Sequence, residues 1–191
     1  MSETPRASSR STILDCVVAL IRSGGTVSLE SAARAAGLTK PGLMYHFPTK
    51  EALMTGLVDH VIDGYVRVFH AHLPAAEPDR DPAAPIPVPT PEQRLSAYVD
   101  WAFSAEIDQS DLVVFTDPRL RGHLTARWTE RLQEWVDVPG DLPPERRARL
   151  LAARLIADGS WFADASGVLP LTGAERHSVW TVARDLIEET S

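Results

Sequence analysis

Apolar residues recur along most of the chain at intervals of three and four positions, the spacing that gathers side chains on one face of an α-helix. The first run covers residues 10–23, where Ile13, Val17 and Ile21 share a face before a Gly-Gly pair ends the pattern. The chain has no strand-rich stretch, internal repeat or heptad array. The sequence therefore predicts an all-α fold.

Two short helices are predicted directly after the first one. Ser28 is a good N-cap for the segment LESAARAAG, but Ser31 at the third helical position, where Glu or Gln is usual, leaves the capping box incomplete. Gly37 is the expected left-handed stop. Thr39 then caps a helix over about residues 40–47, which tolerates a proline in its first turn because those N–H groups have no intrahelical partner.

The rest of the chain predicts longer helices separated by prolines. Thr49 caps a helix that keeps one face apolar to about residue 72. Residues 74–91 hold seven of the fifteen prolines and predict an extended connector. The segment 109–116 is compatible with either a short helix or a strand. Further helices are expected at about residues 91–105, 117–137, 143–165 and 172–188.

Charge is distributed unevenly over the 191 residues. The formal net charge is −7, which by itself argues against a nucleic-acid partner. Residues 1–60, however, carry six basic and five acidic residues, a balance of +1, and the only two lysines, Lys40 and Lys50, bracket one short segment there. An acidic body with a less acidic head suits a protein that contacts DNA at one end.

Composition indicates a globular protein inside the cell. Its 44% hydrophobic and 24% charged residues are typical of a folded soluble chain. No run of apolar residues is long enough to span a membrane, and the polar N-terminus does not resemble a secretory signal. The single cysteine, Cys16, fits a reducing compartment, so we expect a cytoplasmic location.

Two short helices joined by a glycine-containing turn, with a third helix packed behind them, form a helix-turn-helix arrangement. We therefore predict a DNA-binding domain over residues 1–52 and a second domain, which includes the connector, over residues 53–191. In the second short helix Leu43 and Phe47 are expected to face the core, and Gly42 permits close backbone approach to DNA. The side chains left to face a major groove are Thr39, Lys40, Tyr45 and His46.

The segment AARAAGLTKPGLMYHFPTKEALM resembles the TetR family of bacterial transcriptional regulators, and the resemblance extends over about residues 10–57. It joins a turn glycine, at the family's spacing, to an aromatic-His-Phe-x-x-Lys-Glu-x-Leu ending. Pro41 stands where the family usually has glycine and Met44 where it most often has tyrosine. The resemblance implies that bases or phosphates are contacted by Ser28, Thr39, Lys40, Gly42, Tyr45, His46 and Lys50.

The same resemblance implies a homodimer, because in that family the last two long helices pack against their symmetry mates as a four-helix bundle. Residues 145–164 and 172–188 would form this interface. The first of these segments is apolar over more than half its circumference and must bury two faces. A two-fold dimer would present its two copies of the second short helix to a palindromic operator. They would lie about 34 Å apart, the length of one turn of DNA.

Five tryptophans and several phenylalanines fall in the second domain. Aromatic residues in helical bundles usually fill the core, but as a set they could line an apolar cavity that binds a small-molecule effector. Most members of that family are repressors that an effector releases from DNA. The resemblance therefore implies the same function for this chain. The candidate effector-binding residues are Trp101, Phe115, Trp128, Asp158, Trp161 and Phe162.

Two other function classes are compatible with an all-α chain. An enzyme would need a nucleophile and base or a set of metal ligands. Cys16 lies on an apolar stripe, and His70 and His72 diverge on a helix, so we expect no catalytic site, metal or cofactor. A helical adaptor that binds protein through its N-terminal module is the remaining alternative.

Overall fold

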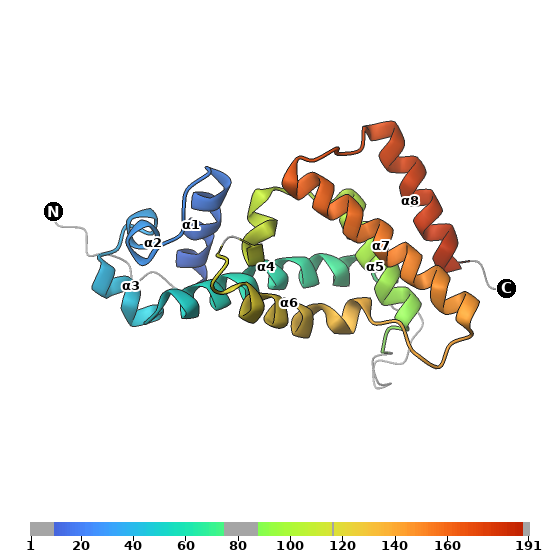
Figure 1. Cartoon of the computed structure of the whole chain (residues 1–191), viewed down its shortest axis with the longest axis horizontal. Coiled ribbons are helices and arrows are strands. Elements are labelled where there is room, and N and C mark those ends of the chain that lie inside the picture. The colour runs from blue at the N-terminus through green and yellow to red at the C-terminus, as the bar shows by residue number, and fades with distance from the viewer. Residues whose placement is uncertain (1–9, 75–87, 116, 189–191) are drawn as a thin grey trace, which may run out of the picture. The chain divides into compact units, whose positions relative to one another are not determined.

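The computed structural model describes residues 10–74, 88–115 and 117–188. Over these residues it consists of eight α-helices and one 3₁₀ helix, without a strand, which confirms the all-α prediction (Figure 1). Most of the predicted connector at 74–91 lies outside the described residues. None of the helices within them is both long enough and apolar enough to cross a membrane.

The chain folds into two compact units. Unit one comprises Met1–Asp63 with Asp108–Arg131, and unit two comprises Gly64–Ile107 with Leu132–Ser191. The division falls within helices α4 (Lys50–His72) and α6 (Arg121–Val136), so each of these helices contributes residues to both units. The predicted domain boundary between residues 52 and 53 stays a prediction.

Unit one is built on α1 (Arg10–Arg22), α2 (Leu29–Ala35) and α3 (Lys40–His46). The first half of α4 and the start of α6 complete it, together with the 3₁₀ helix η1 (Gln109–Phe115). Apolar side chains from α1, α3 and α4 meet in a fully buried core, which removes them from water and provides the main stabilisation of this small unit. Its members include Ile13, Val17, Leu43, Phe47, Leu53, Met54 and Leu57.

The two short helices are defined by local capping. The Ser31 backbone N–H donates to Ser28 Oγ at 3.0 Å, and the Ser28 backbone N–H donates to Ser31 Oγ at 2.8 Å. The capping box is therefore complete, and the expectation that a serine at the third position would leave it open was wrong: its hydroxyl is also an acceptor within reach. Gly37 ends the turn with φ +66°, as predicted.

The segment from residue 109 to residue 121 differs from the prediction in two places. Residues 109–115 form a 3₁₀ helix, which decides between the two conformations left open. Helix α6 begins at Arg121 and not at Asp117, because Asp117 holds a turn instead. Its carboxylate accepts from the Arg119 backbone N–H at 2.9 Å, and its carbonyl accepts from the Leu120 N–H at 3.1 Å.

Unit two contains α5 (Pro91–Ser104), α7 (Pro144–Ser166) and α8 (Gly173–Glu188), which pack on one another. Thr90 caps α5, and Gly167, at φ +70°, ends α7. Figure 1 shows α7 and α8 as antiparallel neighbours. The centre of this unit is aromatic, with buried rings contributed by Tyr65, Phe69, Tyr98, Trp101 and Trp135.

Candidate DNA-binding surface

Helix α3 has one buried and one exposed side. Leu43 is fully buried, whereas Tyr45 is 85% exposed and Lys40 is also exposed. The Thr39 hydroxyl accepts from the Gly42 backbone N–H at 3.2 Å, which orients the first turn of the helix. A two-turn helix with this division can lay its polar side against another molecule without disturbing its packing.

Phe47 and the residues around it anchor the C-terminal end of α3. The Phe47 ring is fully buried, and the Arg10 guanidinium carbon lies 4.3 Å from its centroid. Arg10 Nη1 also donates to the carbonyl of His46 at 2.9 Å, so it occupies one of the acceptors left free at a helix end. A Cβ placed on Gly56 of α4 would lie only 2.9 Å from Phe47 Cε1, so the ring requires glycine there.

Both lysines of the chain have acidic neighbours. Lys40 Nζ contacts Glu30 of α2, and this hydrogen bond is the main cause that lowers the pKa of Glu30. Lys50 Nζ lies 2.6 Å from Asp117 Oδ2, and that bond is the main cause that lowers the pKa of Asp117. Both lysine side chains remain partly exposed, so each carboxylate orients a cation that is still accessible from solvent.

The structure brings most of the sequence-predicted DNA residues to α3 and its flanks. Thr39, Lys40 and Tyr45 are exposed, and Gly42 and His46 are half-buried. Ser28 and Lys50, both half-buried, lie at the starts of the neighbouring helices α2 and α4.

Sequence reasoning missed three residues that support this surface. Arg10 and Asp117 contact residues that lie 36 and 67 positions away in the chain. Gly56 matters only because the Phe47 ring packs against its backbone. No local pattern marks such contacts, so the sequence offered no signal that could have found them.

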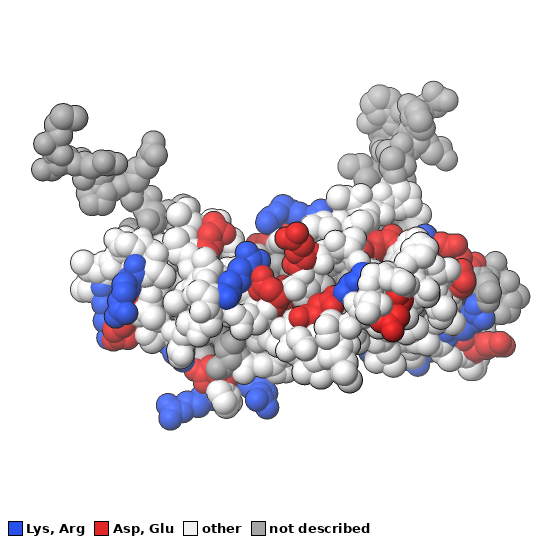
Figure 2. Space-filling model, turned by 90° about the horizontal axis from the view of Figure 1, so that it is seen from above, with Lys and Arg blue, Asp and Glu red and all other residues white. Residues whose placement is uncertain are grey.

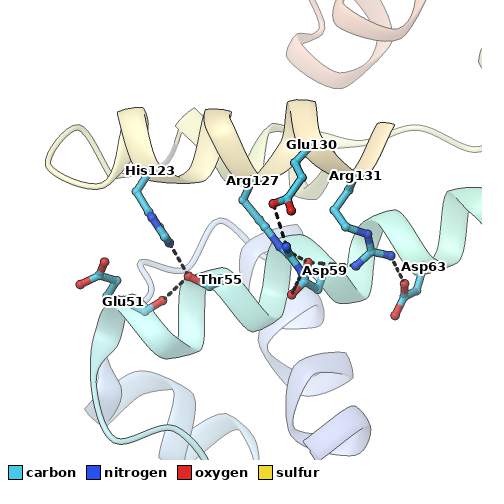
Figure 3. Close-up of polar contacts among 8 residues, drawn as sticks. All are labelled: Glu51, Thr55, Asp59, Asp63, His123, Arg127, Glu130 and Arg131. Atoms are coloured by element: carbon cyan, nitrogen blue, oxygen red, sulfur yellow. Dashed lines mark hydrogen bonds and ion pairs between the residues drawn. The ribbon is translucent and has the colours of Figure 1, made fainter. Parts of the chain in front are cut away.

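Unit one also contains a ladder of polar contacts between α4 and α6 (Figure 3). His123 Nε2 lies 2.9 Å from Thr55 Oγ1, and Arg127 Nε donates to Asp59 Oδ1 at 2.8 Å. Arg131 donates to Asp59 at 3.0 Å and to Asp63 at 2.5 Å. The residues of the ladder recur every four positions on α6 and on α4, so each helix presents one face to the other.

The candidate effector-binding residues are distributed over both units. Phe115 and Trp128 belong to unit one, and the other four belong to unit two. Trp101 is buried in the aromatic centre, and the Tyr98 hydroxyl donates to Asp158 Oδ1 at 2.7 Å. Trp161 is half-buried and Phe162 exposed.

Phe115 lines a cavity of about 420 Å³ in unit one, together with Lys50, Met54 and Asp117.

Charge on the molecular surface is mixed. On the face seen in Figure 2, basic and acidic side chains of the described residues are interspersed and not gathered by sign. Among the residues with described positions, no group of three or more His, Cys, Asp or Glu is placed to hold a metal ion. The features that suit DNA are therefore local to α3 and to the starts of α2 and α4.

Comparison with known proteins identifies the family. Residues 92–188 match the model of the tetracyclin repressor-like C-terminal domain. The chain belongs to the TetR family. This match lies outside residues 10–57, where the sequence resemblance was found, and it complements the helix-turn-helix segment of this TetR-family regulator.

Solved structures of the same fold cover nearly the whole chain. A TetR family member from Streptomyces coelicolor A3 aligns with a TM-score of 0.59 and 19% identity, over 97% of this chain and 100% of that one. The multidrug binding protein EbrR, complexed with imidazole, aligns with a TM-score of 0.59 and 18% identity, over 100% and 97%. No curated protein matches this TetR-family sequence significantly. These neighbours establish the helix-turn-helix plus C-terminal domain fold.

Proposed function

We propose that this TetR-family protein is a cytoplasmic repressor that binds a palindromic operator as a homodimer and leaves it when a small molecule binds. The observation that carries the proposal is the exposure of Thr39, Lys40 and Tyr45 on a helix that Leu43 and Phe47 anchor. Exposed polar side chains on a rigid helix are what reading a major groove about 12 Å wide requires.

The polar side of α3 offers several kinds of DNA contact. Lys40 supplies a cation for a phosphate or a guanine edge, and Tyr45 supplies a hydroxyl and a ring that reaches well beyond the helix surface. Lys50 in the first turn of α4 adds a second cation at a helix N-terminus, where phosphates are favoured. Ser28 and His46 extend the same surface on either side of α3.

The dimer is supported by an apolar stripe on the last two helices. Leu155 and Phe162 of α7 are 61% and 49% exposed, and Val182 of α8 is 53% exposed. Leu155 and Phe162 are seven residues apart and therefore share one helix face, with Gly159 between them. Water-exposed apolar side chains in such a row are stabilised when a second copy covers them.

The effector is proposed by analogy with a solved structure of the same fold. EbrR, a protein of the same fold, is a multidrug binding protein. A ligand releases DNA only if it favours the conformation that binds the operator less well. We assign this chain no catalytic role.

The test is a gel-shift experiment with DNA that flanks the protein's own gene, at about 50 mM salt, where phosphate contacts are strong. Wild-type protein is expected to retard one fragment. Lys40→Ala and Tyr45→Ala should each weaken binding by about tenfold or more, because each removes a proposed DNA contact without touching the core. Arg67→Ala, which removes an exposed arginine of unit two, is the charge-matched control and should bind normally.

Two results would contradict the proposal. One is the absence of a retarded band on every flanking fragment. The other is normal operator binding by both α3 variants. If these variants instead lose capture of a protein partner while no DNA is bound by the wild type, the helical adaptor is the better assignment.

A further inference from the structure

Unit two contains a groove of about 570 Å³ between α5, the N-terminal half of α8 and the end of α4. Its walls include two aromatic rings, two imidazoles, a hydroxyl and a guanidinium, a combination that a purely structural contact between helices does not require. The side chains that matter here are Phe103, Trp180, His72, His177, Ser104 and Arg176. None of them is among the effector residues predicted from the sequence.

The rings at the centre of the same unit pack against one another. Trp101 lies 4.4 Å from Tyr65 and 5.3 Å from Phe69, measured between ring centroids. Trp135 lies 5.0 Å from Phe69 on another side. These are the distances of packed aromatic pairs, so the rings occupy one another's surroundings. A ligand is more easily accommodated in the groove beside α8.

Aromatic surfaces in the groove favour a flat ring. The His177 and Trp180 rings are stacked, with centroids 5.6 Å apart and planes inclined by 29°. Phe103 lies on the opposite helix, α5. The volume is in the range of small-molecule sites and is sufficient for a two-ring compound.

The polar groups of the groove favour a ligand whose ring carries a hydrogen-bond acceptor. The one carboxylate in the groove lining, Asp100, already accepts from Trp180 Nε1 at 2.8 Å and from Arg184 Nη1 at 3.0 Å. Arg176 directs one nitrogen, Nη2, at both oxygens of Asp164, at 2.7 and 2.6 Å. A guanidinium carries five N–H donors, so this pairing orients Arg176 and leaves donors for a ligand. The Ser104 hydroxyl lies 3.5 Å from His72 Nε2, and its O–H is available to a ligand in the tautomer in which that nitrogen donates.

We propose that this groove is the effector site and that its ligand is a flat aromatic carboxylate. The ring lies against Trp180 and Phe103, and the carboxylate accepts from Arg176 and Ser104. The biological role of this site rests on the proposed function, a repressor that an effector releases from DNA. The binding of the ligand to the groove does not depend on that function.

The test compares two probes with the same ring system and opposite charge by isothermal titration calorimetry of the full-length protein. Naphthalene-2-carboxylate should bind with one site per chain and a dissociation constant below about 1 mM, a modest affinity for a ligand of this size. The cation naphthalen-2-ylmethylammonium has the same ring system and should bind at least tenfold more weakly, because the Arg176 guanidinium can donate to a carboxylate but not to an ammonium group.

Variants assign the binding to this groove. Arg176→Gln should weaken naphthalene-2-carboxylate binding about tenfold or more, because a charge-assisted hydrogen bond is lost. Arg176→Lys retains the charge beside Asp164 and should show a smaller loss, which keeps the test valid if Arg176→Gln does not fold. Arg147→Gln removes an exposed arginine in the first turn of α7 and should bind like the wild type.

Three outcomes would overturn the site: no heat with the carboxylate, equal affinity for the ammonium probe, or unchanged affinity in both Arg176 variants. Operator binding by the ligand-free protein is measured in parallel. If operator binding is present and the carboxylate does not bind, the groove proposal fails and the repressor assignment stands. If the carboxylate binds and no operator is found, the repressor assignment fails and the site stands.

Discussion

At the scale of single residues, Phe47 shows how one side chain positions helix α3. Phe47 is the C-cap residue of α3. Its ring is fully buried and contacts Arg10 on one side and Gly56 on the other. The ring is rigid and surrounded, so the contact with Gly56 has little room to relax. The glycine in the middle of a helix, normally unfavourable, is explained by this close approach.

Gly56→Ala tests that explanation. The new Cβ would lie 2.9 Å from Phe47 Cε1, so we expect the free energy of unfolding to fall by about 1–3 kcal/mol, as in overpacked cores. Gly64→Ala in the same helix is the control, because its nearest neighbour would be Arg67 Nη2 at 3.8 Å and alanine favours helix. Urea unfolding followed by circular dichroism measures both. Equal stability of the two variants would refute the proposed contact.

At the scale of helices, the α4–α6 ladder joins parts of unit one that are far apart in the sequence. Thr55 with His123, Asp59 with Arg127, and Asp63 with Arg131 are each separated by 68 positions. Asp59 is the central acceptor, since both arginines donate to it (Figure 3). These hydrogen bonds also raise the pKa of Arg127, chiefly through Asp59.

Asp59→Asn should therefore loosen α6 from α4. The side chains are about a third exposed, which weakens each ion pair, so we expect a loss of about 1–2 kcal/mol in the free energy of unfolding. Asp63→Asn removes a single, more exposed pair and should cost less than about 1 kcal/mol. A double-mutant cycle with Arg127→Gln measures the coupling, and a coupling energy near zero would show that the ladder does not hold the helices together.

At the scale of the whole molecule, the proposed dimer explains the exposed apolar residues of α7 and α8. A repressor that reads a palindrome needs two copies, and the stripe that contains Leu155, Phe162 and Val182 offers a surface on which they meet. In a two-fold interface each residue of the stripe occurs twice, once from each copy. A single substitution therefore changes the interface at two places.

Leu155→Asp should convert the dimer to a monomer. It places two uncompensated carboxylates at the interface, and we expect the dimer dissociation constant to rise by roughly 100-fold or more. Val88→Asp is the matched control, since Val88 is 81% exposed and lies before α5. Analytical ultracentrifugation measures the association state. A Leu155→Asp variant that remains dimeric at micromolar concentration would exclude this stripe from the interface.

Much of the fold follows from short-range features of the sequence. Helix spacing, the caps at Ser28, Thr39 and Thr49 and the stop at Gly37 act within three or four residues, where side chain and backbone meet whatever the rest of the chain does. The start of α6 was misjudged for the same kind of reason: Asp117 can cap a helix or hold a turn, and local sequence does not choose between them.

The sequence by itself determined that this protein is helical, where most of its helices begin and end, and that it carries a helix-turn-helix motif. Only the tertiary structure decided which charges meet, such as Lys50 with Asp117, and which aromatic residues are buried in a centre and which line a groove. Capping and helical periodicity are local in the chain, whereas ion pairs and cavities depend on how distant segments pack, and many packings satisfy the same apolar pattern.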